Sequence, residues 1–513
     1  MTFKPIALAL GLAALVAAGH AAATDSCSPS DIATRHHRID LGGHALGYQT
    51  RAGLLPLRDD KTGQISACVF FTAYVRDPAP GRAARPLTFL WNGGPGASST
   101  LVHLEAFGPR RLISGGDPTQ PEPSLLAMED NPGTLLDQSD LVFVDPVGTG
   151  FSRSASADQG RAFYNVLGDT ASIAQFVGVY RDRFGAKAQP LFLAGESYGV
   201  WRAAGVADAL EKNGDKVAGV ILISGGIPVG PVLKPEIKTA LLTPNRTAAA
   251  FYFGKLPADL QGNFGGAVAA SQKWAETIYA PALLRGDALA PAERETIALQ
   301  LARFTGLDPK DIDRATLVAP RHLIATRLAA SQGKTLGTLD VRVTSPEHDS
   351  AARVALIERY FREDLGFEDD QPYLGLGDEH RSPAEAQWAY NQADAPGAVI
   401  VTAPDKAQHP VAAAAWAIAM DGPPGGSQPW LTRAIEADPG LKVFIAAGWY
   451  DSYNSCVGNA YLVAHLPPAL GRNMTPVCYR SGHMIYRDKD AGLKLRSDLR
   501  RFYDLALGRP GGR

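Results

Sequence analysis

The chain has 513 residues, of which 45% are hydrophobic and 20% are charged. Its 50 lysines and arginines nearly balance 52 aspartates and glutamates, so the formal net charge is -2. These proportions exclude a disordered chain, and the balanced charge argues against a nucleic-acid-binding protein, which needs a basic surface. No apolar run reaches the roughly 18 residues of a membrane-spanning helix, which excludes a polytopic membrane protein.

The first residues have the pattern of a targeting segment. Lys4 precedes an apolar run over 6–18, and the sequence G-H-A-A-A-T at 19–24 ends in small residues. This pattern predicts a signal peptide over 1–23 rather than a buried N-terminal helix. We therefore expect an exported protein without stable membrane insertion after cleavage. The short, alanine-rich form is typical of bacteria and indicates a periplasmic or secreted location.

The cysteine count is even, and an exported protein meets an oxidising environment. The four cysteines are Cys27, Cys68, Cys456 and Cys478. We expect the disulfides Cys27–Cys68 and Cys456–Cys478, because each joins segments that are close in sequence. The alternative is four buried thiols. No C-x-x-C pattern supports a zinc or redox site.

Short apolar runs that each end in a glycine or polar residue predict the strands of a central sheet. The run 68–75 alternates and predicts an early antiparallel strand. The others are apolar throughout, which favours parallel strands buried on both faces by helices. These runs are 86–91, 140–145, 190–194, 217–223 and 441–447, with a late strand at 475–480. Helices are predicted at 161–184, 199–213 and 488–507.

The character of the chain changes between 229 and 430. Alanine, leucine, arginine and glutamate dominate there, helical periodicity recurs at 291–304 and 350–364, and clear strand patterns are absent. We predict a core of 24–228 and 431–513, interrupted by a largely helical insertion over 229–430. A flexible glycine- and proline-rich stretch at 421–427 marks its end.

Residues 195–199 read G-E-S-Y-G, between the predicted strand 190–194 and the helix 199–213. The bare G-x-S-x-G pattern also arises by chance in a glycine-rich chain. Its strand–turn–helix context makes it typical of a nucleophile elbow, in which glycines allow a sharp turn that exposes the serine. We therefore predict that Ser197 is a catalytic nucleophile, which needs an adjacent base.

In a fold with such an elbow, the acid and then the histidine follow the serine along the chain. Six histidines follow Ser197, and only His483 lies in a turn between a late strand and the terminal helix. Asp451 follows the strand 441–447 in a strand-end loop. We predict His483 as the base and Asp451 as its orienting acid. The alternatives are a structural histidine and a helix N-cap.

An oxyanion hole requires two converging backbone amides. One is expected from Tyr198, which follows the nucleophile, and the other from the glycine loop 92–96, where we assign Gly94. A phosphate-binding interpretation of this loop is weaker, since no Lys-Ser or Lys-Thr pair follows it. No metal and no organic cofactor are implied by the sequence.

Several motifs occur together in a characteristic order. They are W-N-G-G-P-G-A-S-S at 91–99, F-V-D-P-V-G-T-G-F-S at 143–152, G-E-S-Y-G at 195–199, the strand-end aspartate and G-H-M at 482–484. In this combination the chain resembles the serine carboxypeptidases, peptidase family S10, and in particular their bacterial branch. The resemblance implies an α/β-hydrolase fold with a helical cap and an exopeptidase that acts on peptides with a free C-terminus.

The resemblance also implies a cluster that binds the substrate's terminal carboxylate. It assigns Asn92 and Glu196 to this cluster. Burial beside the elbow favours the neutral form of Glu196, which can donate a hydrogen bond, so we expect activity to favour mildly acidic pH. The family's second glutamate falls on Ala106 here. The neighbouring Glu105 either pairs with Glu196 or leaves the pair incomplete.

Three functions therefore compete. The first is a serine carboxypeptidase with an acyl-enzyme on Ser197, supported by Asn92 and Glu196. The second is an esterase or acyltransferase that uses the same triad. This alternative stays open because Glu105 lies one residue before the position of the family's second glutamate. The third is a non-catalytic binding protein on a hydrolase scaffold, which the full set of catalytic candidates disfavours.

Overall fold

The computed structural model describes residues 32–78, 84–113, 117, 119, 127–230, 233–344, 351–376, 380–390, 399–420 and 426–509. The predicted signal peptide and Cys27 lie outside these residues. Within them, a ten-stranded sheet has the order β1-β2-β3-β7-β4-β9-β10-β13-β14, and β8 (Arg153–Ser154) pairs with β3. The strands are β1 (Ala33–Asp40), β2 (Ala45–Arg58), β3 (Ile65–Arg76), β4 (Leu87–Trp91), β7 (Asp140–Val144), β9 (Leu191–Glu196), β10 (Val217–Ile223), β13 (Lys442–Gly448) and β14 (Met474–Tyr479).

The sheet is parallel from β7 to β14. Strands β4, β7 and β9 are buried along their whole length, which explains why their sequences are apolar rather than alternating. All seven predicted strands are present, within a few residues of their expected bounds. The predicted α/β class with a mostly parallel sheet is confirmed.

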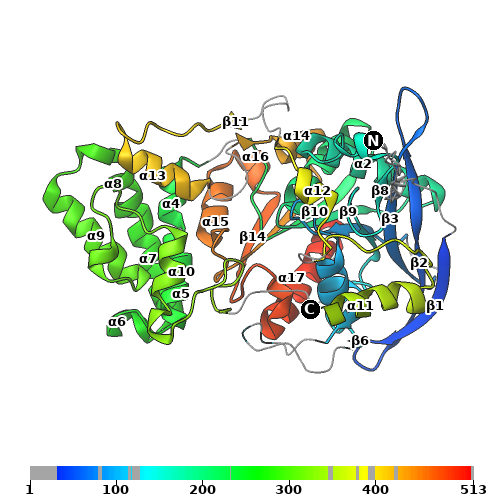
Figure 1. Ribbon diagram of the computed structural model, residues 1–513, viewed down its shortest axis with the longest axis horizontal. Helices are drawn as coiled ribbons and strands as arrows, with labels where there is room; N and C mark the ends of the chain where they lie inside the picture. Colours follow the sequence, from blue (N-terminus) through cyan, green and yellow to red (C-terminus); the bar gives the residue numbers. More distant parts are fainter. Residues whose placement is uncertain are drawn as a thin grey trace, which may run out of the picture.

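The first strands form an antiparallel extension at one edge (Figure 1). Strand β3 was predicted, but β1 and the 14-residue β2 were not. Strand β1 is mostly exposed and carries two histidines and two arginines, so it has no apolar pattern. Strand β2 contains Gly53 and Pro56, which are rare in strands.

Helices cover both faces of the sheet. Helices α2 (Val166–Arg183), α3 (Gly199–Lys212) and α14 (Trp430–Ala437) pack on the face that presents Phe89. Helix α17 (Lys489–Ala506) and η1 (Val102–Phe107) pack on the opposite face, which presents Leu90. Successive residues of β4 therefore enter two separate cores, as expected for a strand covered on both sides.

Between β10 and β13, most described helices gather beside the sheet; in Figure 1 they are green, except for the yellow-orange α13. They share a core of their own that includes Ala249, Trp274 and Leu301. They are α4 (Pro235–Leu241), α5 (Thr243–Tyr252), α6 (Ala258–Gln261), α7 (Phe264–Trp274), α8 (Ala280–Arg285), α9 (Pro291–Thr305), α10 (Arg321–Arg327) and α13 (Pro410–Ala419).

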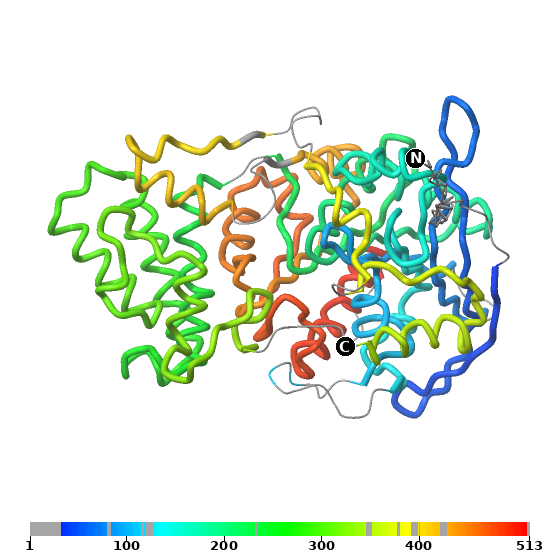
Figure 2. The backbone as a smooth tube through the Cα atoms, viewed as in Figure 1, coloured from blue at the N-terminus to red at the C-terminus, as the bar shows by residue number. Residues whose placement is uncertain are grey.

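A later part of the same stretch returns to the sheet. The continuous helix α11 (Ala351–Arg359) and η6 (Tyr360–Asp364) runs beside the antiparallel strands (Figure 2). Its Ile357 and Phe361 share a core with Leu54 and Phe70. Helix α12 (Pro383–Gln387) follows, and its N-cap Ser382 donates to the carbonyl of Gly96 at 2.6 Å. The domain bounds 24–228, 229–430 and 431–513 stay predictions.

The cysteines differ from the expected pattern. Cys68 is disulfide-bonded, and its predicted partner Cys27 lies outside the described residues. Cys456 and Cys478 are free thiols, so the predicted disulfide between them is wrong for this structure. Burial raises the pKa of Cys456, which keeps it as the less reactive neutral thiol. Among the described residues, no helix has the length and apolar character needed to cross a membrane.

Candidate active site

Ser197 lies at a sharp turn between β9 and α3, as the G-x-S-x-G pattern predicts. Its φ is 59°, in the left-handed region that side chains other than glycine rarely adopt. Its amide donates to the carbonyl of Ile223 in β10 at 2.9 Å, which fixes the turn to the neighbouring strand. A Cβ atom at Gly195 would lie 1.9 Å from the carbonyl oxygen of Gly199, so the turn requires glycine there. The backbone therefore has the strained form of a nucleophile elbow.

The glycine loop after β4 lies directly against the elbow. A Cβ atom at Gly93 would be only 2.5 Å from the backbone nitrogen of Tyr198. Gly94 has a φ of 94°, which explains the need for glycine at this bend. The indole of Trp91 donates to the carbonyl of Gly199 at 2.9 Å and joins the two segments. The backbones that we assigned to the oxyanion hole, at Gly94 and Tyr198, thus belong to adjoining segments.

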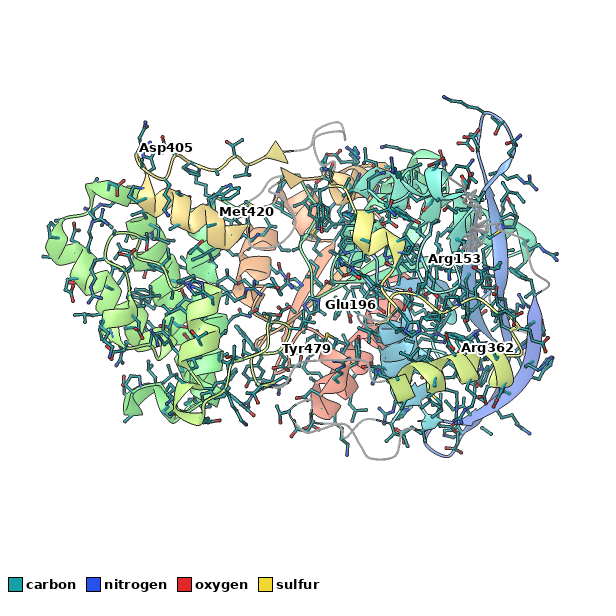
Figure 3. All side chains as sticks on the ribbon, viewed as in Figure 1. Arg153, Glu196, Arg362, Asp405, Met420 and Tyr479 are labelled. Atoms are coloured by element: carbon teal, nitrogen blue, oxygen red, sulfur yellow. The ribbon has the colours of Figure 1, made fainter. Side chains whose placement is uncertain are left out.

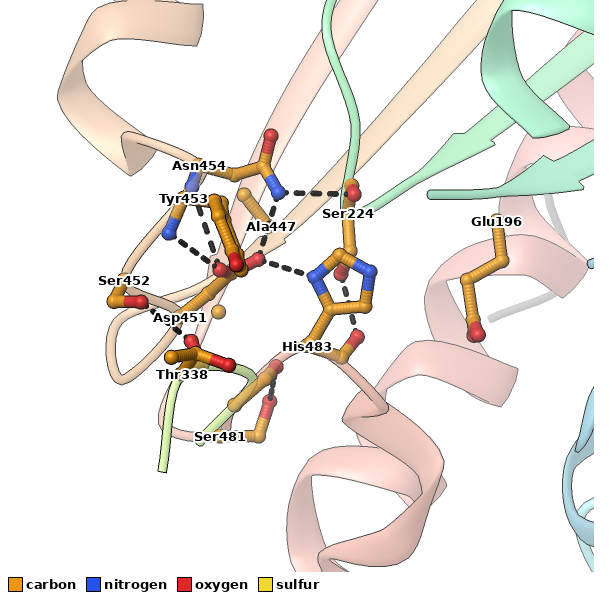
Figure 4. A network of polar contacts seen from close by, with 12 residues as sticks. Glu196, Ser224, Thr338, Ala447, Asp451, Ser452, Tyr453, Asn454, Ser481 and His483 are labelled. Atoms are coloured by element: carbon orange, nitrogen blue, oxygen red, sulfur yellow. Dashed lines mark hydrogen bonds and ion pairs between the residues drawn. The ribbon is translucent and has the colours of Figure 1, made fainter. Parts of the chain in front are cut away.

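The predicted base and acid form a short hydrogen-bonded pair. Nδ1 of His483 lies 2.7 Å from Oδ2 of Asp451, and both side chains are buried (Figure 4). The other edge of the imidazole faces the side on which Glu196, the residue before Ser197, lies. His483 and Asp451 follow β14 and β13, respectively, which are parallel neighbours. Their loops consequently meet at the same edge of the sheet, the carboxyl ends of the strands.

Residues that we did not predict hold this pair in place. Asp451 Oδ2 also accepts from the side-chain amide of Asn454 at 2.8 Å, and its Oδ1 accepts from the amide of Tyr453. Asn245, from α5, donates to the carbonyls of residues 448, 451 and 454 and thereby orders the whole loop. Ser224 donates to the backbone carbonyl of His483 at 2.6 Å. The Asp451 carboxylate therefore has a fixed orientation toward the imidazole.

Glu196 is buried at the end of β9, near the middle of the molecule in Figure 3. Its Oε1 accepts from the side-chain amide of Asn92 at 2.9 Å and from the hydroxyl of Tyr486 at 3.1 Å. Its Oε2 is buried and has no hydrogen-bond partner among the described residues. Burial raises the pKa of Glu196 to about 7, although His483, Tyr486 and Arg487 act in the opposite direction.

Glu105 lies near Glu196 but is held by arginines. The carboxylate forms ion pairs with Arg353 of α11 and, at 2.7 Å, with Arg487 of η8 (Ile485–Arg487). Burial acts to raise the pKa of Glu105, but these two guanidinium groups lower it below its usual value. Glu105 is therefore a paired carboxylate, and no hydrogen bond between it and Glu196 is present in the described structure.

The sequence offered weak signals for the residues that we missed. Tyr486 and Arg487 lie just after the G-H-M motif at 482–484, on the turn that leads into α17. Asn454 lies three residues after Asp451, a spacing that suits a side chain bonding within its own loop. In the described parts of the chain, no group of three or more His, Cys, Asp or Glu side chains is arranged to hold a metal ion.

Comparison with known proteins gives a consistent result. The pheromone-processing carboxypeptidase KEX1 of Saccharomyces cerevisiae is 32% identical over 160 residues, which cover 29% of this chain and 21% of KEX1. The serine carboxypeptidase-like 36 protein of Arabidopsis thaliana is 32% identical over 130 residues, 24% of each chain. The curated relatives are thus matched over about a fifth to a quarter of their length.

The fold extends further than the sequence similarity. The crystal structure of the prohormone-processing carboxypeptidase KEX1(Δ)P from Saccharomyces cerevisiae aligns with a TM-score of 0.52 at 17% identity. The alignment covers 90% of this chain and 91% of that one, which confirms the α/β-hydrolase fold. Residues 47–245 match the family Peptidase_S10, serine carboxypeptidase. This segment, which contains the glycine loop and the elbow, is thus similar to the serine carboxypeptidase family.

Proposed function

We propose that this protein is a serine carboxypeptidase, which removes residues from the C-terminal end of peptides through an acyl-enzyme on Ser197. The observation that carries the proposal is the buried Glu196 beside the elbow. Two donors, Asn92 and Tyr486, share its Oε1, whereas Oε2 has no partner among the described residues. An ester-hydrolysing site has no need of a buried carboxyl group that presents one unpaired oxygen next to the nucleophile.

In the proposed reaction each group has a distinct role. The Ser197 hydroxyl attacks the carbonyl of the last peptide bond, and His483 takes the hydroxyl proton and returns it to the departing amino acid. Asp451 keeps the proton of the imidazole on Nδ1, the nitrogen 2.7 Å away. The amides of Gly94 and Tyr198 bind the oxyanion. Water then releases the shortened peptide from Ser197 by the same steps in reverse.

In this proposal Glu196 binds the substrate's terminal carboxylate. Since Oε1 already accepts from two donors, the proton of the neutral acid resides on Oε2. A carboxylic acid O–H donated to a carboxylate is a charge-assisted hydrogen bond, which is stronger than a neutral one. The Asn92 amide helps to hold this orientation. The charges of Glu105 and Arg487 act on Glu196 in opposite directions: Glu105 raises its pKa and Arg487 lowers it.

The proposal extends to the setting of the enzyme. Its substrates are peptides with a free C-terminus, and its place is in the bacterial branch of the family. The pattern over residues 1–23 supports export to the periplasm or the medium. The helices between β10 and β13 would act as a cap over the carboxyl ends of the strands and thereby determine which side chains are accepted.

A pair of matched substrates tests the proposal. A blocked dipeptide acid is expected to be cleaved about 10- to 100-fold faster than its C-terminal amide, because the amide cannot accept the charge-assisted hydrogen bond from Glu196. Mass spectrometry of a digested peptide pool should show residues lost singly from the C-terminal end. Equal rates on the acid and the amide would reject carboxylate recognition and favour the esterase or acyltransferase alternative.

The pH dependence of binding supplies a second test. Because the pKa of Glu196 is about 7, the group is neutral and donates below that pH, and it is charged and repels the substrate carboxylate above it. We expect the KM of the acid substrate to rise by about tenfold per pH unit above pH 7, whereas that of the amide stays constant. In Glu196→Gln the donor does not titrate, so the KM of the acid should no longer depend on pH. Parallel profiles for acid and amide would contradict this assignment.

A further inference from the structure

A buried ion pair lies beneath the proposed oxyanion hole. Arg202, near the start of α3, and Asp169, near the start of α2, have side chains that are 1% and 3% exposed. The Nε of Arg202 lies 2.9 Å and 3.1 Å from the two carboxylate oxygens of Asp169. A buried ion pair is weak evidence for stability, because desolvation cancels much of the attraction between its charges. The role of this ion pair must therefore be inferred from the other contacts that Arg202 and Asp169 make.

Both partners also bind the segments that carry the oxyanion amides. Nη1 of Arg202 donates to the carbonyl oxygen of Asn92 at 2.7 Å. The hydroxyl of Tyr198 donates to Asp169 at 3.2 Å, and the guanidinium of Arg202 lies 5.4 Å from the centre of the Tyr198 ring. One buried pair thus contacts the glycine loop on one side and the residue after the nucleophile on the other.

The contact with Asn92 fixes the orientation of the glycine loop. The carbonyl of Asn92 and the amide of Gly93 belong to the same planar peptide unit and point in opposite directions. Holding the carbonyl toward Arg202 therefore turns the Gly93 amide away from α3 and sets the direction in which the chain enters Gly94. The loop has little freedom of its own, since Gly93 already lies against the backbone of Tyr198.

We propose that Arg202, with Asp169, is a positioning residue that holds the two oxyanion-hole amides, at Gly94 and Tyr198, in convergent orientations. This inference depends on the proposed function, because it assumes that Ser197 is the nucleophile. Displacement of a donor by a fraction of an ångström weakens the stabilisation of the transition state far more than the binding of substrate. Loss of Arg202 should consequently lower kcat while leaving KM almost unchanged.

The rate at which a fluorophosphonate labels Ser197 tests the inference without depending on the substrate. Arg202→Lys keeps a positive charge beside Asp169 but lacks the second nitrogen that donates to the Asn92 carbonyl. Arg202→Met loses the contacts with both Asp169 and Asn92. We expect both variants to be labelled about 100-fold more slowly, the cost typical of one oxyanion donor. We expect a similar loss of affinity for a peptide boronic acid, whose tetrahedral adduct places an oxygen in the hole, and a KM within about twofold of wild type.

A matched control and a milder variant keep the outcomes distinct. Asp208→Asn breaks a different ion pair of α3, the one between Asp208 and Arg433. This pair does not contact the glycine loop, so Ser197 in this variant should be labelled at the wild-type rate. Tyr198→Phe removes only the hydroxyl contact with Asp169 and should be labelled about tenfold more slowly even if Arg202→Met does not fold. Wild-type labelling rates in folded Arg202→Lys and Tyr198→Phe, with only the melting temperature lowered, would overturn the positioning role. A wild-type protein that is not labelled at all would instead overturn the proposed function, and this inference with it.

Discussion

Replacing Ser197 by alanine is expected to lower kcat by about 10⁶-fold on a blocked dipeptide acid, since no acyl-enzyme can form without the hydroxyl. The residual rate should still exceed that of the uncatalysed reaction, because the oxyanion amides and the carboxylate site continue to bind substrate. The KM should change little for the same reason. Hydrolysis followed by mass spectrometry, together with loss of fluorophosphonate labelling, checks this result.

Ser271 offers a matched control for this substitution. It is a buried serine in α7 whose hydroxyl donates only to the carbonyl of Val268, within its own helix. Ser271→Ala should therefore retain wild-type kcat and labelling, with a stability change of about 1 kcal/mol or less. Substantial activity in folded Ser197→Ala would mean that another group is the nucleophile.

Replacing Asp451 by asparagine is the second large effect, with an expected fall in kcat of about 10⁴-fold. The asparagine amide would donate to Nδ1 of His483 where the carboxylate accepted, 2.7 Å away. The neutral imidazole would then carry its proton on Nε2 and be unable to take the proton of Ser197. Steady-state kinetics on the acid substrate measure the loss, and unchanged circular dichroism shows that the fold is intact.

The appropriate comparison is an aspartate that has only a structural role. Asp488 caps α17 by accepting from the amide of Ala491, and it also forms an ion pair with Arg342 at 3.1 Å. Asparagine serves equally well as a cap and loses only the ion pair. Asp488→Asn should therefore leave kcat near the wild-type value. A fall of less than about tenfold in Asp451→Asn would show that the orientation of His483 does not depend on this carboxylate.

The parts of the fold that could be predicted are those with a local pattern. Strands β4, β7 and β9 are apolar because both faces are buried, so their sequences alone identify them. Strand β1 escaped prediction because pairing with β2, rather than side-chain burial, determines the conformation of this exposed edge strand. Strand β2 is mostly buried, but Gly53 and Pro56 interrupt its strand pattern. The return of α11 to β2 and β3 likewise depends on contacts between distant segments, which no local pattern encodes.

The same distinction holds for the site. Ser197, His483 and Asp451 were predicted because each follows a recognisable strand, and strand order brings their loops to one edge of the sheet. The buried pair of Asp169 and Arg202 was not predicted, since charged residues near helix starts are ordinarily exposed and their partners here come from another helix. The arginines that bind Glu105 come from η8 and α11, which are distant in sequence, so only the folded chain shows that Glu105 is paired.

The order of the strands along the chain has a consequence for biosynthesis. The elbow is complete once α3 has formed, but β13 and β14, which precede the proposed acid and base, emerge from the ribosome only after α4 to α14. If Ser197 needs this base, a nascent chain carries an unactivated serine through about half of its translation. In the proposed mechanism, the catalytic groups therefore come together only after the last quarter of the polypeptide has packed against β9 and α3.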